Sequence, residues 1–377
     1  MLLGGLSAKR FLREHWQKKP LLVRGALPDF RDPLSPDELA GLACEDGVES
    51  RIVRARGWRV TYGPQDERVF AKLGARGWTL LVQEVNRWVP DAALLLDRFG
   101  FVPNVRVDDI MVSYAARGGG VGPHLDSYDV FLVQGEGKRR WRWSERLPRN
   151  ARFRAGLELR ILENAELERD EVLERGDMLY LPPGFAHEGT AVTPCLTYSV
   201  GFRSPNLGEL WRDFAESHLG GATLLVDPPL APAENPGAIP KSMLARVRRA
   251  VRSLDAPDDA LDRWFARFAT RLKPGHDLEA PRRVPSASAI ATRRAAIERT
   301  EEGRWAYLDR PRGALYLYVA GHELDVPHAA AALAKKLCAS RRHDTLTAPN
   351  PESRDLLVAL FAIGALHFVP RQRGREP

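Results

Sequence analysis

Residues 118–126 read GGGVGPHLD and residues 176–187 read GDMLYLPPGFAH, and these two segments decide the fold. His124 and Asp126 are two residues apart, so on an extended strand their side chains point to the same side. His187 follows a Pro-Pro-Gly turn that ends a short apolar run, which predicts a position at the rim of a sheet. Two histidines and one carboxylate form the facial triad of non-haem iron sites, which leaves coordination positions open. The sequence therefore predicts a metal site on a β-rich scaffold.

Either motif alone is a weak signal, because most His-x-Asp pairs lie on protein surfaces. The two motifs occur here in order, separated by enough chain for several strands. Their combined spacing resembles the two motifs of the cupin superfamily, whose fold is a double-stranded β-helix of the jelly-roll class. Short β runs punctuated by glycine and proline over residues 108–203 agree with this fold.

A second signal follows the first motif. Residues 129–134 read as an apolar strand, a Gly-Glu-Gly turn follows, and residues 138–143 read KRRWRW. With a period of two, Arg139 shares a face with Trp141 and Trp143. A guanidinium on an inward face needs a carboxylate, because an unpaired buried charge is too costly. A dicarboxylate ligand gripped bidentately would supply it; a protein Asp or Glu, or a place on the barrel surface, would satisfy the pattern equally.

Several segments carry a closer resemblance to a known family. They are residues 11–25 (FLREHWQKKPLLVRG), 107–114 (VDDIMVSY), 118–133, 137–141 (GKRRW) and 176–189. These segments are similar to the bacterial ribosomal oxygenases, which are JmjC-type 2-oxoglutarate-dependent hydroxylases. The resemblance covers about the first 205 residues in specific motifs and the remainder only in layout.

The resemblance implies Fe(II) as metal, with 2-oxoglutarate and O2 as co-substrates. It assigns iron binding, and so the catalytic centre, to the triad His124, Asp126 and His187, and the distal carboxylate of 2-oxoglutarate to Arg139. The implied activity is a peptidyl-arginine 3-hydroxylase, which hydroxylates the β-carbon of an arginine in large-subunit ribosomal protein sixteen.

Two further 2-oxoglutarate contacts are expected by resemblance. Relatives often carry a small hydroxylated residue before the glycine loop; Ser113 is available here, although Ala115 occupies the next position on the same face. An amide side chain is common after the last histidine, and Thr197 stands at the matching place. Each residue is either a contact to 2-oxoglutarate or an ordinary strand residue.

An arginine substrate favours acidic or aromatic residues at the mouth of the site. Asp108, Asp109 and Tyr128 are the candidates, and each has the alternative of a strand-end cap or a core residue.

Other functions share the same core. A JmjC enzyme acting on histidine or methyl-lysine would look much the same, whereas an isomerase or a dioxygenase without co-substrate would not need Arg139. A non-catalytic, ribosome-binding cupin scaffold would leave its partner unmodified.

Composition sets broad limits. The 377 residues are 44% hydrophobic, and no apolar run approaches the 18 residues of a membrane span. Three cysteines without metal or disulfide spacing, together with Fe(II), favour a reducing cytoplasm. The net charge of +7 permits a nucleic-acid contact but does not indicate one, because 49 acidic residues are interleaved with 56 basic ones.

The sequence predicts an α+β protein in three segments. Residues 1–205 form the JmjC/cupin domain, and helices are expected at residues 7–19 and 35–43. Residues 206–275 contain predicted helices at 207–219, 242–254 and 258–272, with a proline-rich link at 227–240. The relatives that the chain resembles dimerise through this region, so a homodimer is expected. The alternative is that these helices pack within one chain. Residues 276–377 contain helices and a hairpin at 305–319, and resemble a winged helix.

Overall fold

The computed structural model describes residues 2–218, 241–252, 256–292, 296–300, 304–344 and 346–369. These residues form two compact units. One unit comprises Met1–Ser204, Ala296–Glu302 and Ala339–Asp344, and the other comprises Pro205–Ala295, Gly303–Cys338 and Thr345–Pro377. The predicted proline-rich link at 227–240 lies outside the described residues, and the predicted three-segment division stays a prediction.

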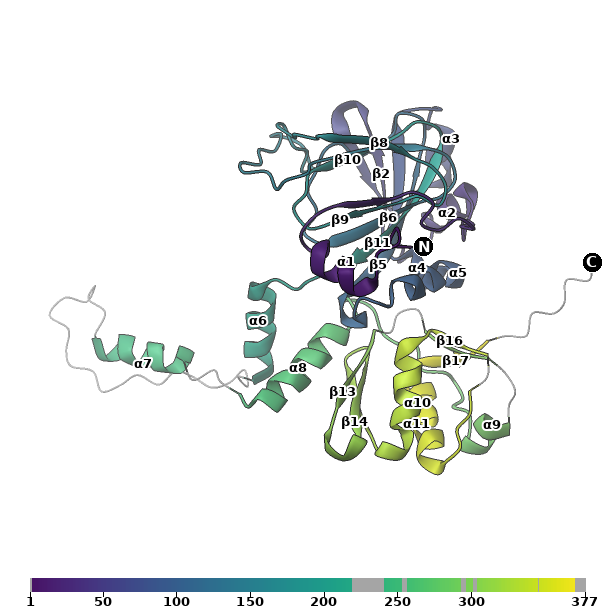
Figure 1. Cartoon of the computed structure of the whole chain (residues 1–377), viewed down its shortest axis with the longest axis vertical. Coiled ribbons are helices and arrows are strands. Elements are labelled where there is room, and N and C mark those ends of the chain that lie inside the picture. Colours follow the sequence, from purple (N-terminus) through teal and green to yellow (C-terminus); the bar gives the residue numbers. More distant parts are fainter. Residues whose placement is uncertain are drawn as a thin grey trace, which may run out of the picture. The chain divides into compact units, whose positions relative to one another are not determined.

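The first unit, which we call the barrel unit, combines short helices with a large sheet, a small sheet and one further antiparallel pair of strands (Figure 1). Its helices are α1 (Ala8–Glu14), α2 (Pro36–Leu42), α3 (Glu67–Ala71), α4 (Val85–Trp88) and α5 (Pro90–Ala93), with 3-10 turns at Arg56–Trp58, Leu94–Phe99 and Asn104–Arg106. Its strands are β1 (Leu21–Val23), β2 (Ser50–Arg54), β3 (Arg59–Tyr62), β4 (Trp78–Val82), β5 (Val107–Ala115), β6 (Asp129–Gln134), β7 (Arg139–Trp143), β8 (Arg169–Leu173), β9 (Met178–Leu181), β10 (His187–Ala191), β11 (Cys195–Phe202), β12 (Ile297–Arg299) and β16 (Arg342–His343).

Eight antiparallel strands form the large sheet, in the order β1-β9-β6-β11-β5-β4-β2-β3. Three more form the small sheet, in the order β10-β7-β8. Several neighbours in these sheets, such as β1 and β9, β5 and β11, or β6 and β11, are distant in sequence, as in a jelly roll, and this agrees with the predicted double-stranded β-helix.

The two faces of the large sheet have different partners. On β11, Leu196, Tyr198 and Val200 point into the main core, where Phe11 of α1 also packs. The alternate residues of β11 face the other way and line a pocket. On β6, Val130 and Leu132 face the tryptophans of β7 in a second, smaller core. The period-two pattern therefore separates a packed outer face from an inner face that is free to hold a site.

The first helix is shorter than the sequence predicts. Ser7 caps it as expected, because its hydroxyl accepts a hydrogen bond from the Arg10 N–H, but α1 ends at Glu14. Gln17 then adopts a positive φ of 56°, and its N–H donates to the Tyr180 hydroxyl at 2.8 Å. This contact to β9 replaces the next helical hydrogen bond. The second predicted helix is confirmed as α2, and a full capping box opens it.

The second unit contains helices and a three-stranded sheet. Its helices are α6 (Leu207–His218), α7 (Lys241–Arg252), α8 (Asp258–Thr270), α9 (Ala287–Thr292), α10 (His328–Ala339) and α11 (Pro351–Ala362), and its strands are β13 (Trp305–Asp309), β14 (Leu315–Val319), β15 (His322–Val326) and β17 (Leu366–Phe368). The predicted hairpin is confirmed as β13 and β14, which pair antiparallel around a 3-10 turn at Pro311–Gly313.

Helices α6 and α8 pack through Phe214 and Trp264, whose rings lie 5.1 Å apart and edge to face. The Trp264 indole also donates to Asp213. The apolar side chains of α6 are only partly covered, because Trp211 remains 60% exposed. No residue of α7 is buried.

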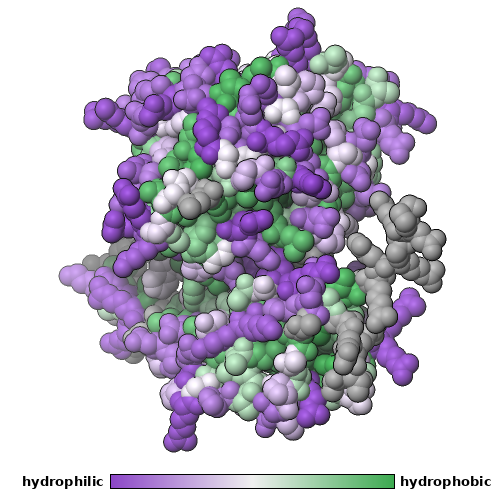
Figure 2. All heavy atoms as spheres, turned by 45° about the vertical axis from the view of Figure 1, so that its right-hand side comes forward, coloured by the Kyte–Doolittle hydropathy of each residue, from purple (hydrophilic) through white to green (hydrophobic). Residues whose placement is uncertain are grey.

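No described helix has the length and apolar character to cross a membrane. On the face shown in Figure 2, hydrophilic side chains cover most of the surface and hydrophobic ones form smaller patches between them.

We expect Phe131→Ala to destabilise the barrel unit by about 3–5 kcal/mol, because a fully buried aromatic ring is removed. The ring centroid of Phe131 lies 5.6 Å from that of Phe11 and 4.7 Å from those of Phe99 and Tyr180. Urea unfolding followed by tryptophan fluorescence measures the change. Val172→Ala, at a side chain that is 38% exposed on β8, is the matched control, and an equal shift in the two variants would contradict this account of the core.

Candidate functional site

The two motifs meet as an antiparallel backbone bridge between the glycine loop and the start of β10. The His124 N–H donates to the His187 carbonyl at 3.0 Å, and the His187 N–H donates back to the His124 carbonyl at 3.1 Å. The Gly184 N–H also donates to the Asp126 carbonyl at 2.8 Å. These hydrogen bonds hold the two motifs in fixed register, so the three predicted ligands come together.

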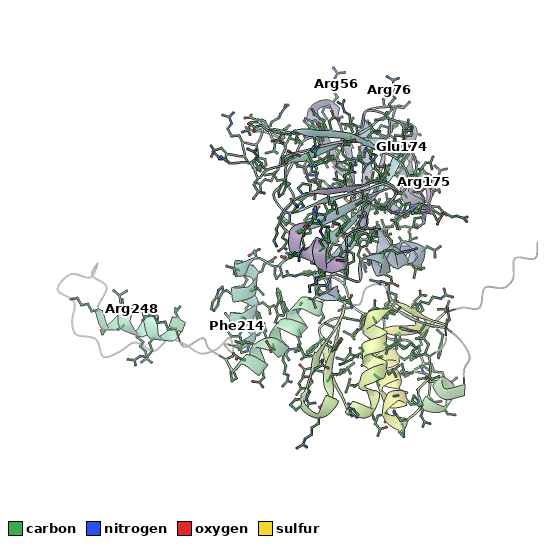
Figure 3. All side chains as sticks on the ribbon, in the orientation of Figure 1. Arg56, Arg76, Glu174, Arg175, Phe214 and Arg248 are labelled. Atoms are coloured by element: carbon green, nitrogen blue, oxygen red, sulfur yellow. The ribbon has the colours of Figure 1, made fainter. Side chains whose placement is uncertain are left out.

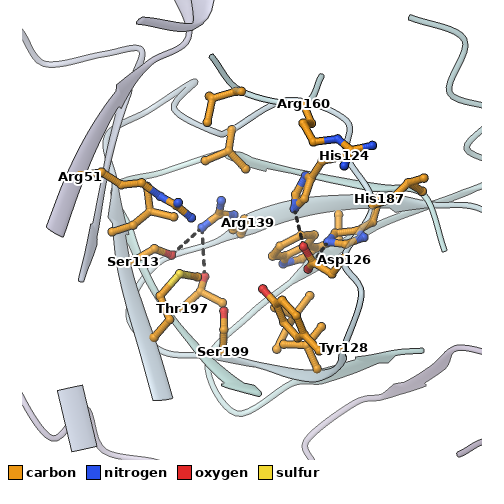
Figure 4. Close-up of a pocket in the computed structure, with 18 of the residues that line it drawn as sticks. Arg51, Ser113, His124, Asp126, Tyr128, Arg139, Arg160, His187, Thr197 and Ser199 are labelled. Atoms are coloured by element: carbon orange, nitrogen blue, oxygen red, sulfur yellow. Dashed lines mark hydrogen bonds and ion pairs between the residues drawn. The ribbon is translucent and has the colours of Figure 1, made fainter. Parts of the chain in front are cut away.

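The triad side chains converge at one point (Figure 4). Nε2 of His187 lies 3.4 Å from one Asp126 oxygen, and Nε2 of His124 lies 3.8 Å from the other. The candidate ligand atoms all lie within 4.8 Å of one another. Within the described part of the chain, no other cluster of three or more His, Cys, Asp or Glu side chains has this spacing.

Hydrogen bonds fix the orientation of both imidazoles. Nδ1 of His124 lies 2.9 Å from the Gly122 carbonyl, and Nδ1 of His187 lies 2.9 Å from the Phe185 carbonyl. A carbonyl oxygen only accepts, so each Nδ1 carries the hydrogen and each Nε2 directs a lone pair at the centre of the triad. This donor set fits a divalent transition metal.

The electrostatics of the triad agree with ligands that are ready to bind a cation. Burial, reinforced by His187, lowers the pKa of His124 to about 4, so the ring is neutral at physiological pH. Burial alone would raise the pKa of Asp126, but the two histidines outweigh it and lower this pKa to about 2. Both states, neutral imidazole and carboxylate, are the ones that bind metals.

Arg139 lies buried in the same pocket, with 3% of its surface exposed. One guanidinium nitrogen donates to the Ser113 hydroxyl at 3.0 Å and the Thr197 hydroxyl at 3.4 Å, and the other donates to the Gly189 carbonyl at 3.4 Å. Its Nε has no hydrogen-bond partner. Burial lowers the pKa of Arg139. Among the described residues no carboxylate pairs with Arg139. The structure therefore shows neither of the two alternatives considered for Arg139, an ion pair with a protein Asp or Glu or a position on the barrel surface.

A glycine makes room for this arginine. A Cβ added to Gly189 would lie 2.6 Å from Nε of Arg139 and 2.8 Å from the Trp141 ring, far inside normal contact. The Arg139 guanidinium also lies over the Trp141 ring at 4.9 Å from its centroid. The glycine and the tryptophan together set the direction in which Arg139 points.

The pocket that joins the triad to Arg139 is largely apolar. Beyond the triad, Arg139, Ser113 and Thr197, it is lined by Arg51, Leu81, Met111, Val121, Leu125, Tyr128, Val130, Leu132, Trp141, Leu159, Arg160, Ile161 and Ser199. Trp58 closes over the glycine loop, because a Cβ added to Gly122 would lie 3.0 Å from its ring. Such a lining excludes water around a few polar groups.

The three residues predicted to lie at the mouth of the site differ in where the structure places them. Tyr128 lines the pocket as the sequence suggested. Asp109 is buried, accepts a hydrogen bond from the Glu84 N–H, and does not line the pocket; Asp108 does not line it either. Sequence analysis missed Arg51, because its place in the pocket depends on β2 joining the sheet beside β4, which no local pattern reveals.

Two family models match the chain. A JmjC domain matches residues 94–210, and a ROXA-like winged helix matches residues 250–367.

The similar proteins are ribosomal oxygenases. The Escherichia coli protein named ribosomal protein uL16 3-hydroxylase is 41% identical over 72% of this chain and 73% of its own length. A probable ribosomal oxygenase of Haemophilus influenzae is 44% identical over 54% and 52% of the two chains. The crystal structure of E. coli ycfD aligns over 97% of this chain and 99% of its own, with a TM-score of 0.81 and 35% identity. A ycfD structure in complex with cobalt and 2-oxoglutarate aligns over 97% and 98%, with a TM-score of 0.79 and 34% identity.

Replacing His187 by alanine should weaken divalent-metal binding at least about 100-fold, because two ligands remain where three converged. Titration of the purified protein with Co(II), followed by absorption and calorimetry, measures the affinity. Ser127→Ala, at an exposed side chain beside the triad, should leave it unchanged. Tight stoichiometric binding by the His187 variant would remove this residue from the metal site.

Proposed function

The chain belongs to the bacterial JmjC-type ribosomal oxygenases, and we propose that it is a 2-oxoglutarate- and Fe(II)-dependent hydroxylase of a large-subunit ribosomal protein, acting on an arginine β-carbon. The observation that carries this proposal is that one apolar pocket holds both a three-ligand triad and a buried arginine to which the described residues offer no carboxylate.

We assign iron binding to His124, Asp126 and His187. When Fe(II), 2-oxoglutarate and O2 are bound, they supply the oxidising chemistry that replaces a C–H bond by C–OH, with release of succinate and CO2. The protein contributes ligand orientation, through the Nδ1 hydrogen bonds of both histidines, and a pocket with little water.

Arg139 receives the distal carboxylate of 2-oxoglutarate in this proposal. Its guanidinium offers several donors to one carboxylate, and such a bidentate pair compensates the buried charge. Ser113 and Thr197 hold Arg139 in place through their hydroxyls, and we propose that the same hydroxyls reach the bound carboxylate.

An arginine substrate has a candidate partner on one wall of the pocket. Tyr128 lines the pocket, and its hydroxyl oxygen can accept a hydrogen bond from a guanidinium. The E. coli relative is named for 3-hydroxylation, that is, for reaction at the β-carbon.

The other candidate functions make different use of the site. A non-catalytic scaffold would not require a buried arginine, Arg139, next to a metal-binding triad. Enzymes for histidine or methyl-lysine would share the triad and Arg139, so the residue modified separates them from this proposal.

The test is tandem mass spectrometry of large-subunit ribosomal proteins incubated with the purified enzyme, Fe(II), ascorbate and 2-oxoglutarate. We expect one added oxygen on the β-carbon of an arginine in the uL16 homologue, dependent on 2-oxoglutarate. The same gain on a histidine would keep the oxygenase and discard the arginine. Absence of both the added oxygen and succinate would favour the scaffold.

Two variants should weaken 2-oxoglutarate binding without loss of metal. Arg139→Met removes the charge-assisted hydrogen bonds, and Gly189→Ala displaces the guanidinium; each should raise the KM for 2-oxoglutarate about 10- to 100-fold. Steady-state kinetics and Co(II) titration measure the two properties. Arg140→Met, on the exposed face of the same strand, is the control. An unchanged KM in Arg139→Met would show that the carboxylate binds elsewhere.

We also propose a homodimer formed by helices α6, α7 and α8. These helices leave apolar side chains exposed, among them Leu207 at 74%, Trp211 at 60% and Val251 at 65%. Exposed apolar surface of this kind marks protein interfaces, and a second copy of the chain would cover it.

Trp211→Glu should convert the dimer to a monomer, because it places a charge in the apolar interface. Size-exclusion chromatography with light scattering gives the mass of the wild type and the variant, and Tyr62→Glu, at a side chain of the barrel unit that is 54% exposed, is the control. A wild-type protein with the mass of one chain at micromolar concentration would refute the dimer.

A further inference from the structure

Arg51 is one of two arginines that line the pocket besides Arg139, and the function proposed so far does not use it. It rises from β2 and lines the cavity together with the triad and Arg139. Its Nε is buried and has no hydrogen-bond partner, and the described residues offer its guanidinium no ion pair. A buried guanidinium donor without an acceptor points to an acceptor that arrives with a ligand.

The sheet register explains how Arg51 reaches the site. Arg51, Leu81, Ser113 and Thr197 are cross-strand partners in one row across β2, β4, β5 and β11. Arg51 therefore points to the inner face of the sheet, and Figure 4 shows its guanidinium turned into the pocket. Arg56, further along the same hairpin, points outward into solvent (Figure 3). The direction of Arg51 is thus a property of its position in the register.

Two ligand groups can be excluded as its partner. A substrate guanidinium carries the same charge and would be repelled. The distal carboxylate of 2-oxoglutarate already has Arg139, with Ser113 and Thr197 beside it. Arg51 and Tyr128 line the same pocket, so Arg51 shares the cavity with the residue assigned to the substrate.

The position of the reacting carbon supplies the remaining argument. A β-carbon is one bond from the peptide backbone, so hydroxylation there brings the backbone of the target residue into the pocket beside the triad. Its carbonyl group leaves water and needs a donor inside an apolar lining. Reaction at a carbon further along the side chain would leave the backbone outside.

We propose that Arg51 binds the substrate backbone, by donating guanidinium N–H groups to the main-chain carbonyl oxygen of the residue that is hydroxylated. The inference rests on the proposed function, β-carbon hydroxylation of a peptide, and it adds the residue that sets how deep the peptide enters. Arg51 thereby selects the β-carbon over carbons further along the side chain.

Arg51→Met tests the proposal in the full-length enzyme, with a synthetic peptide that contains the target arginine. The KM for peptide should rise about 10- to 100-fold, the loss of a hydrogen bond to a charged group, while the KM for 2-oxoglutarate stays within about twofold. Arg51→Lys should recover only part of the loss, because an ammonium lacks the planar fork. Arg54→Met, on the same strand and outside the pocket lining, is the control.

A modified substrate isolates the contact itself. A thioamide at the carbonyl of the target residue is a weaker acceptor, and it should lower kcat/KM about tenfold for the wild type. The same substitution should have little effect on Arg51→Met, because the donor is already gone. Thermal unfolding of each variant confirms that the fold is retained.

The results that would contradict the role of Arg51 differ from those that would contradict the proposed function. A rise in the KM for 2-oxoglutarate that equals the rise for peptide would make Arg51 a co-substrate ligand and overturn the inference while the proposed function stands. Equal thioamide effects in wild type and Arg51→Met would overturn the carbonyl contact in the same way. Wild-type hydroxylation at a carbon other than the β-carbon would overturn the proposed regiochemistry and, with it, the inference.

Discussion

A cation buried without a counter-ion is the constraint on which the pocket depends. Arg139 begins β7, and Trp141 and Trp143 follow it on the inward face. Among the described residues, the groups that accept its hydrogen bonds are two hydroxyls and one carbonyl. Burying a charge in this way is destabilising by several kcal/mol unless the charge is paired. In the proposed function, the distal carboxylate of 2-oxoglutarate would pair with this charge.

Two neighbouring residues allow the Arg139 side chain to extend into the pocket. Gly189 on the neighbouring strand leaves the space, and the Trp141 ring supports the guanidinium from one side. The outward residues of β7 behave oppositely, since Arg140 and Arg142 pair with Asp170 and Glu188 at the surface. One strand thus carries arginines with and without acidic partners, and the difference is the face on which each lies.

Local pattern predicted the parts of the structure that local physics determines. The triad, the inward face of β7 and the alternation along β11 all follow from period two and from two motifs, and the structure brings these residues together. The Ser7 cap could be predicted from the sequence. The early end of α1 could not, because there the Gln17 N–H donates a hydrogen bond to the hydroxyl of Tyr180 on β9, which is distant in sequence. Arg51 was invisible for the same reason: strand order decides which side chains share a pocket, and strand order is set by long-range pairing. Asp109 satisfied the pattern of a mouth residue, yet its carboxylate accepts a backbone hydrogen bond instead.

Each metal-site histidine is oriented by a carbonyl only two residues before it in the chain. The orientation of each imidazole ring is therefore set by the backbone next to it in sequence. The backbone bridge between His124 and His187 holds the two segments in register. In small zinc domains the ion organises the chain, and its removal unfolds them. We therefore expect folding and metal uptake to be separable in this protein, with a bound ion adding stability through mass action. A site of this kind would lose and regain its ion without refolding, so its occupancy would follow the supply of metal.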